Sequence, residues 1–231
     1  MRLPFMVMAV LIGMSALAAG CQGGPTLHGW QITPTPAAGF ALTNQQGESV
    51  QLGDFRGDLV VLTFLYSNCT TACPLISLHL KRAADQLTPQ EVGQVHFMAA
   101  SLDPERDTPE TAAVYVEAFP TPQGLIFLTG PRAELEPVWA SYNIVVRKVT
   151  DMPAPATEGT AMPQEGQEGQ EGQEGMDMQE GHTGHTGYIV EHTVVAYLID
   201  QQGVTQAAYV PSEGFDPGHL VEDIRTLLTH Q

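Results

Sequence analysis

A long apolar segment that ends in a pair of cysteines restricts the folds available to this 231-residue chain. Residues 59–66 form a nearly continuous run of aliphatic, β-branched and aromatic side chains, which is typical of a strand buried on both faces of a sheet. Cys69 and Cys73 follow, and Pro74 suits the first turn of a helix. The sequence therefore predicts an α/β fold in which both cysteines lie where a central strand gives way to a helix.

Strands and helices alternate along most of the chain, and a hairpin and a helix close it. The other expected strands are 40–43, 49–52, 95–102, 126–128, 144–146, 193–200 and 204–210. The expected helices are 74–87, 107–119, 133–142 and 215–228. This order predicts a thioredoxin-like α/β sandwich of the glutaredoxin and peroxiredoxin type, a central mixed sheet flanked by helices.

The N-terminal region predicts export. Residues 1–21 carry Arg2, then an apolar run, then small residues before Cys21, as in a bacterial lipoprotein signal whose cysteine is lipidated. An uncleaved anchor helix is the alternative, although the run is shorter than the about 20 residues that span a bilayer. We expect a spacer at 22–37, rich in Gly, Pro and Thr, and a domain at 38–231 held on the extracytoplasmic face of the bacterial membrane.

Residues 151–187 interrupt the pattern of strands and helices. Gln-Glu-Gly occurs four times in succession from residue 164, and such a polar, low-complexity segment predicts a disordered loop inserted into the domain. Residues 151–191 hold nine acidic and no basic residues, about half of the net charge of −17. A chain this acidic cannot replace phosphate counterions, which excludes nucleic acid as a partner.

The spacing of Cys69 and Cys73 places both sulfurs on one side of a helical first turn. The helix N-terminus favours thiolates there, and two thiolates suit Cu(I), while an added imidazole makes a site acceptable to Cu(II) also. A structural zinc site would need four ligands. The alternative is a structural disulfide, because a Cα separation of about 6 Å in a helix permits one.

Three motifs in order resemble the Sco/SenC family of copper-binding proteins over about residues 38–230, apart from the inserted loop. The first motif comprises 53–57, 60–64 and 69–74 (Cys-Thr-Thr-Ala-Cys-Pro), and the second is 102–110 (Leu-Asp-Pro-Glu-Arg-Asp-Thr-Pro-Glu). The third comprises 191–193 (Glu-His-Thr), 197–200 and Gly203. The sequence departs from the family where Thr70 and Thr71 replace the usual proline and acidic residue, which affects the expected redox potential and partner contact more than the ligands.

The resemblance implies a thioredoxin fold in which Cys69, Cys73 and His192 bind one copper ion. It also implies a copper chaperone, not an enzyme, that serves the binuclear CuA centre of cytochrome c oxidase subunit II. Another periplasmic copper carrier is the alternative partner, and a membrane lies near through the N-terminal lipid or anchor.

Two enzymatic functions remain as alternatives. A thiol–disulfide reductase would use Cys69 and Cys73 as a redox pair that keeps the CuA-site cysteines reduced. Thioredoxin-like reductases carry a cis-proline facing the active cysteines, and the comparable place here holds Val194 and Val195, which favours a metal site. A peroxidase is the weaker alternative, because no residue marks a pocket that would activate peroxide.

Further polar residues have two readings each. Asp103 and Asp107 could tune the site electrostatically, although a turn and a helix cap explain Asp107 equally well. The inserted loop carries soft and imidazole side chains just before His192, which we interpret either as a weak copper-collecting arm or as a solvated linker. These candidate auxiliary copper ligands are Met176, Met178, His182 and His185.

Overall fold

The computed structural model describes residues 25–150, 188–211 and 215–230. Its helices are α1 (Ala72–Ala84), α2 (Pro89–Val92), α3 (Pro109–Ala118), α4 (Arg132–Ser141) and α5 (Pro217–Thr229), with a 3-10 turn at Leu52–Phe55. Its strands are β1 (Trp30–Pro36), β2 (Ala41–Asn44), β3 (Ser49–Gln51), β4 (Leu59–Leu65), β5 (Val95–Ser101), β6 (Ile126–Thr129), β7 (Val146–Val149), β8 (Ile189–His192), β9 (Ala196–Ile199) and β10 (Val204–Tyr209). The predicted export signal with Cys21, the predicted inserted loop, and Met176, Met178, His182 and His185 lie outside the described residues.

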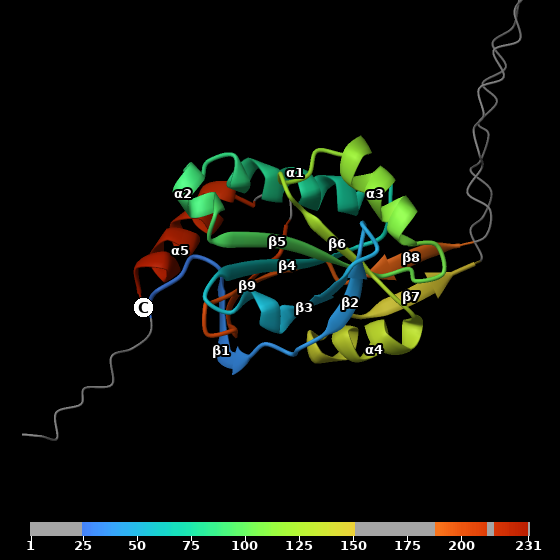
Figure 1. Cartoon of the computed structure of the whole chain (residues 1–231), viewed down its shortest axis with the longest axis horizontal. Helices are drawn as coiled ribbons and strands as arrows, with labels where there is room; N and C mark the ends of the chain where they lie inside the picture. Colours follow the sequence, from blue (N-terminus) through green and yellow to red (C-terminus); the bar gives the residue numbers. More distant parts are fainter. Residues whose placement is uncertain (1–24, 151–187, 212–214, 231) are drawn as a thin grey trace, which may run out of the picture.

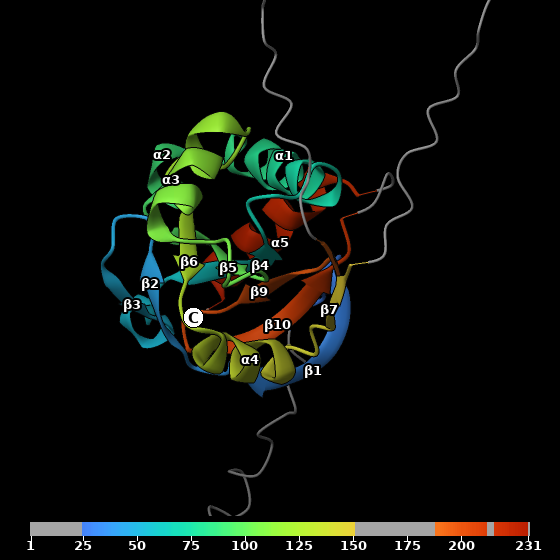
Figure 2. The ribbon, with the colours of Figure 1, turned by 90° about the vertical axis from the view of Figure 1, so that its right-hand side faces the viewer.

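Eight strands form one mixed sheet in the order β1-β10-β9-β4-β5-β6-β2-β3. Strand β4 pairs in parallel with β5 and antiparallel with β9, so it lies inside the sheet as predicted. Figures 1 and 2 show α1 and α3 over one face and α4 over the other. The predicted architecture, a central mixed sheet flanked by helices, is confirmed.

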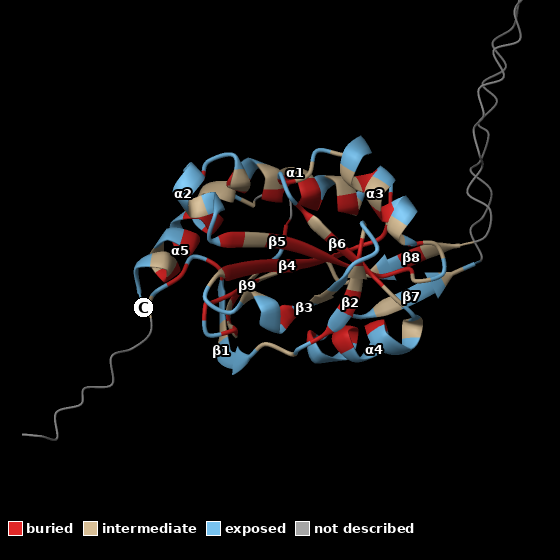
Figure 3. Cartoon of the chain, viewed as in Figure 1, coloured by how far each residue is buried: buried red, intermediate tan, exposed pale blue. Residues whose placement is uncertain are grey.

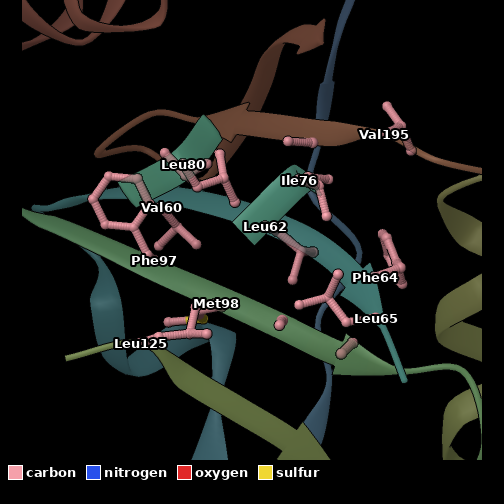
Figure 4. Packing of buried hydrophobic residues seen from close by; sticks show 14 of the residues in the cluster. Val60, Leu62, Phe64, Leu65, Ile76, Leu80, Phe97, Met98, Leu125 and Val195 are labelled. Atoms are coloured by element: carbon pink, nitrogen blue, oxygen red, sulfur yellow. The ribbon is translucent and has the colours of Figure 1, made fainter. Parts of the chain in front are cut away.

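Strand β4 is the centre of the core. All seven of its residues are buried, and Figure 3 shows β4 and most of β5 in the colour of buried residues. In Figure 4, Leu62 and Leu65 lie among side chains of β5 and of α1, including Met98 and Ile76. The rigid packing around β4 fixes the place where the chain leaves the sheet toward the two cysteines.

The structure differs from the sequence prediction at the N-terminal spacer, because Trp30–Pro36 form strand β1. This strand pairs antiparallel with β10, from Trp30 opposite Ala208 to Pro36 opposite Val204. Prolines are tolerated on an edge strand, where one side of the backbone has no partner strand. The folded domain therefore begins before residue 38.

The chain around β1 is also held to α5. The carboxylate of Asp223 accepts hydrogen bonds from the backbone N–H groups of His28 (2.8 Å) and Gly29 (2.9 Å) and from the hydroxyl of Tyr209. A Cβ atom at residue 29 would lie 2.7 Å from the Tyr209 ring, so this approach requires glycine.

Strands β7 and β8 form a separate two-stranded sheet, here called the β7–β8 ribbon. His192 is the last residue of β8 and lies opposite Val146, whereas the sequence predicted no strand here and placed His192 just before a strand at 193–200. No helix in the described part of the chain is both long and apolar enough to cross a membrane.

Candidate metal centre

Three side chains from three elements meet at one end of the sheet. Cys69 follows β4, Cys73 is the second residue of α1, and His192 ends β8. Their two Sγ atoms and one imidazole nitrogen lie within 4.8 Å of one another, and the Cys73 Sγ–His192 Nε2 distance is 3.9 Å. Within the described residues this is the one group of three or more His, Cys, Asp or Glu side chains spaced to hold a metal ion.

The orientation of His192 leaves one nitrogen free for a metal. Its Nδ1 lies 2.9 Å from the Thr193 carbonyl oxygen, which can only accept, so Nδ1 carries the proton and donates. The lone pair of Nε2 then faces Cys73. The ring packs edge-on to Tyr66, with centroids 5.7 Å apart, so its plane is fixed as well. A backbone carbonyl that holds the second nitrogen of a histidine is typical of metal sites.

The two cysteines differ in protonation. A hydrogen bond from the Cys73 thiol, with others from the backbone N–H groups of Cys73 and Thr71, lowers the pKa of Cys69 to about 3. Burial and the neighbouring Cys69 sulfur raise the pKa of Cys73 above its usual range. The prediction that both sulfurs favour the thiolate therefore holds for Cys69 and is wrong for Cys73, because the side chain of Cys73 is completely buried.

The donor set and its spacing fit a soft metal ion. The cysteines are not joined to each other, so both sulfurs are available. Metal–sulfur and metal–nitrogen bonds of about 2.3 and 2.0 Å, at trigonal angles, separate the donor atoms by about 3.7 Å. The distance from Cys73 Sγ to His192 Nε2, 3.9 Å, is close to this value before any metal is bound.

Comparison with known proteins identifies the family. Residues 33–162, more than half of the chain, match the model of the SCO1/SenC family. The chain belongs to the SCO1/SenC family. It is 29% identical over 143 residues to a SCO1 protein homolog of Bacillus subtilis, and the match covers 61% of this chain and 71% of that protein. The chain spans less than half the length of the mitochondrial relatives that it matches.

Solved structures of Sco proteins share the fold. Apo Sco1 of Thermus thermophilus is similar with a TM-score of 0.63 and 26% identity, over 87% of this chain and 97% of that one. Copper-bound ScoI of Bradyrhizobium japonicum has a TM-score of 0.59 and 24% identity, over 84% and 99%. A third, BsSco, is described as a member of the Sco family of cytochrome c oxidase assembly proteins, with a TM-score of 0.57, 20% identity and coverage of 89% and 98%. The predicted thioredoxin-like fold is confirmed.

Asp107 organises the loop before the first cysteine of this SCO1/SenC chain. Its Oδ1 accepts from the Ser67 backbone N–H (3.0 Å) and hydroxyl, and its Oδ2 accepts from Ser101 (2.6 Å). Thr108, not Asp107, caps α3, so the helix-cap interpretation of Asp107 is wrong. Its carboxyl lies near enough to contribute to the raised pKa of Cys73, which agrees with an electrostatic role.

Two tyrosines at the site were missed by sequence reasoning. The Tyr66 carbonyl accepts from the Cys69 backbone N–H at 3.2 Å and its ring packs against His192, and the Tyr188 hydroxyl donates to the buried Asp103. Tyr66 ends a hydrophobic segment, and this pattern predicts a side chain of the core and not of a functional site. Tyr188 follows the low-complexity segment and was not assigned to any element.

Proposed function

We propose that this chain binds one copper ion, as Cu(I) or Cu(II), through Cys69, Cys73 and His192. The observation that carries the proposal is the Cys-Cys-His group within 4.8 Å, reached from three separate elements. Two soft sulfurs suit Cu(I), and the imidazole makes Cu(II) acceptable. The likeness to copper-bound ScoI of Bradyrhizobium japonicum supports copper over other soft ions.

We further propose that copper is cargo and that the chain is an assembly factor for cytochrome c oxidase. The cysteines are nearly inaccessible, at 3% and 0% exposure, whereas His192 is partly exposed. Cysteines or histidines of a partner would therefore approach from the histidine side and displace His192 first. The proposed acceptor is the CuA centre of subunit II or another periplasmic copper carrier, with the chain anchored to the membrane through Cys21 or an N-terminal helix.

Copper titration of the reduced, full-length protein tests the ligand set. The unmodified chain should bind one copper ion per chain, and Cys73→Ser should abolish tight binding. His192→Ala should weaken binding and change the thiolate-to-copper absorption. His230→Ala is the matched control, because His230 is an exposed histidine at the end of α5. Unchanged affinity and spectrum in His192→Ala would refute the three-ligand site.

A thiol–disulfide reductase is the second candidate, and the lowered pKa of Cys69 favours it, because a thiolate is the attacking species in disulfide exchange. Two observations favour copper instead. Cys69 is buried, and the described residues contain no cis peptide bond at the place where reductases hold substrate. Normal disulfide reduction by His192→Ala, combined with undiminished copper binding, would favour the reductase.

A further inference from the structure

The third donor, His192, is carried by a ribbon that the large sheet does not hold. Among the described strands, β7 and β8 pair only with each other. Figure 1 shows this ribbon projecting beside the end of the sheet where β4 and β5 finish. Val190 of β8 packs on the core and the Val195 carbonyl accepts from Thr63 of β4, and the side chains that fasten the ribbon to the domain add to these contacts in setting the distance between His192 and the cysteines.

Strand β8 is fastened through Tyr188 to the turn that follows β5. The Tyr188 hydroxyl donates to Asp103 Oδ1 at 2.6 Å, and Asp103 has no exposed surface. The guanidinium of Arg106 donates to the Tyr188 carbonyl oxygen at 2.9 Å and lies over the ring, 3.5 Å from its centroid. Arg106 also pairs with Asp103 at 3.5 Å. Tyr188 is thus held at its hydroxyl, its ring and its backbone.

Strand β7 is fastened to the same turn through Lys148. Its ammonium group lies 2.8 Å from Glu105 Oε2 and 4.4 Å from the centroid of the Tyr188 ring. Arg132 of α4 holds the other oxygen of Glu105 at 2.6 Å. Both strands of the ribbon are therefore tied to residues 103–106.

The turn at 103–106 is hydrogen-bonded through its preceding residue to the end of β4, the strand that leads to the two cysteines. The backbone N–H of Leu102 donates to the carbonyl of Leu65, the last residue of β4, at 2.8 Å. The chain reaches Cys69 only four residues after Leu65. The two cysteines and the fastening of the ribbon thus share one rigid frame.

We propose that Asp103, Glu105 and Arg106, with Lys148 and Tyr188, form a positioning clamp that holds His192 within reach of the two cysteines. None of the five is a ligand, and each acts through the ribbon. The proposal gives the charged part of the 102–110 motif a mechanical role. The effect of the clamp on copper affinity rests on the proposed function, whereas its effect on hydrogen exchange of the β8 amides does not. Groups that orient a metal ligand in this way typically change metal affinity about 10- to 100-fold when they are removed.

Tyr188→Phe and Arg106→Gln, in the full-length protein, test the clamp. Tyr188→Phe keeps the ring and removes the bond to Asp103, so the fold is retained. Arg147→Gln is the matched control, because Arg147 lies on the same ribbon but pairs with Glu191 at the surface and is itself 71% exposed. Two quantities are measured: hydrogen exchange of the β8 amides in the reduced, metal-free protein, and copper affinity with its absorption spectrum.

Both clamp variants should exchange the β8 amides about ten-fold faster than the unmodified chain, as expected for the loss of a hydrogen bond to a charged group. Copper affinity should fall about ten-fold or more, and the spectrum should shift toward that of His192→Ala. Arg147→Gln should match the unmodified chain in both measurements.

Unchanged β8 exchange in Tyr188→Phe and Arg106→Gln, or equally fast exchange in Arg147→Gln, would overturn the clamp. Should Arg106→Gln fail to fold, Lys148→Met, at a partly exposed position, replaces it with the same expectations. A chain that bound no copper at all would refute the proposed function, and the exchange measurement would still decide on the clamp.

Discussion

Cys69 and Cys73 lie four residues apart, yet their surroundings give them different charges. The Cys73 thiol and backbone N–H groups donate hydrogen bonds to the Cys69 sulfur and hold its pKa at about 3. Burial of the Cys73 side chain raises the pKa of Cys73. At neutral pH the reduced, metal-free pair therefore carries one proton. That single proton lies between the two sulfurs that a metal ion would bridge.

Copper binding near pH 7 should release one proton per ion, from Cys73, because Cys69 is already a thiolate. The apparent affinity should then weaken about ten-fold per unit as pH falls through neutrality, and more steeply as pH approaches the pKa of Cys69. Calorimetry in buffers of different ionisation enthalpy counts the protons. Release of two protons would mean that both thiols are protonated in the free protein.

His192 shows what sequence reasoning could and could not predict at the level of residues. The cysteines follow from the strand-to-helix transition, whereas the histidine was singled out by resemblance to a family. The raised pKa of Cys73 was not predictable, because it arises from packing between α1 and the sheet. Tyr66 was missed for the same reason, since its contact with Cys69 exists only once the chain has folded.

At the scale of elements, predictions succeeded where the hydrophobic pattern was strong. Strands β4 and β5 and helices α3 and α4 lie within a few residues of their expected positions. Strand β1 was missed because Pro34 and Pro36 read as a spacer, although an edge strand tolerates them. Strand β8 was missed because it is four residues long and adjoins a low-complexity segment.

The attachment of β1 to α5 depends on Asp223. Asp223→Ala would leave two backbone N–H groups and the Tyr209 hydroxyl without their acceptor, so the free energy of unfolding should fall by about 2–4 kcal/mol. Urea unfolding followed by circular dichroism measures the loss. Glu222→Ala is the control, because Glu222 is adjacent to Asp223 in the sequence but its carboxylate pairs with His28 at the surface. This substitution should change the free energy of unfolding by less than about 0.5 kcal/mol. Equal losses in the two variants would contradict the anchoring role of Asp223.

At the scale of the whole molecule, one core supports both the fold and the site. Leu62 is completely buried at the centre of β4, so Leu62→Ala should lower the free energy of unfolding by about 2–5 kcal/mol. Val114→Ala, at a position 64% exposed on α3, should stay within about 0.5 kcal/mol. Urea unfolding with an unchanged m value tests both expectations. A small effect of Leu62→Ala would mean that the packing around β4 relaxes.

Copper should stabilise the folded chain, because the unfolded chain does not hold its three donors together. Free copper at 100 times its Kd should add about 2.7 kcal/mol and raise the Tm by about 5–10 °C. A chelator should reverse the shift, and His192→Ala should reduce it. Differential scanning calorimetry of the reduced protein measures the shift. The same Tm with and without copper would show that the ion does not bind the folded site.

The place where the chain enters the fold bears on how the protein would face its surroundings. Strand β1 starts beside α5, and Figure 1 shows this end of the sheet opposite the β7–β8 ribbon. An anchor at the N-terminus would therefore hold the domain at the end where β1 starts, and the cysteines and His192, at the opposite end, would point away from the bilayer. An acceptor on the same membrane would have to extend past the whole domain to reach the site, or the domain would have to reorient relative to the bilayer.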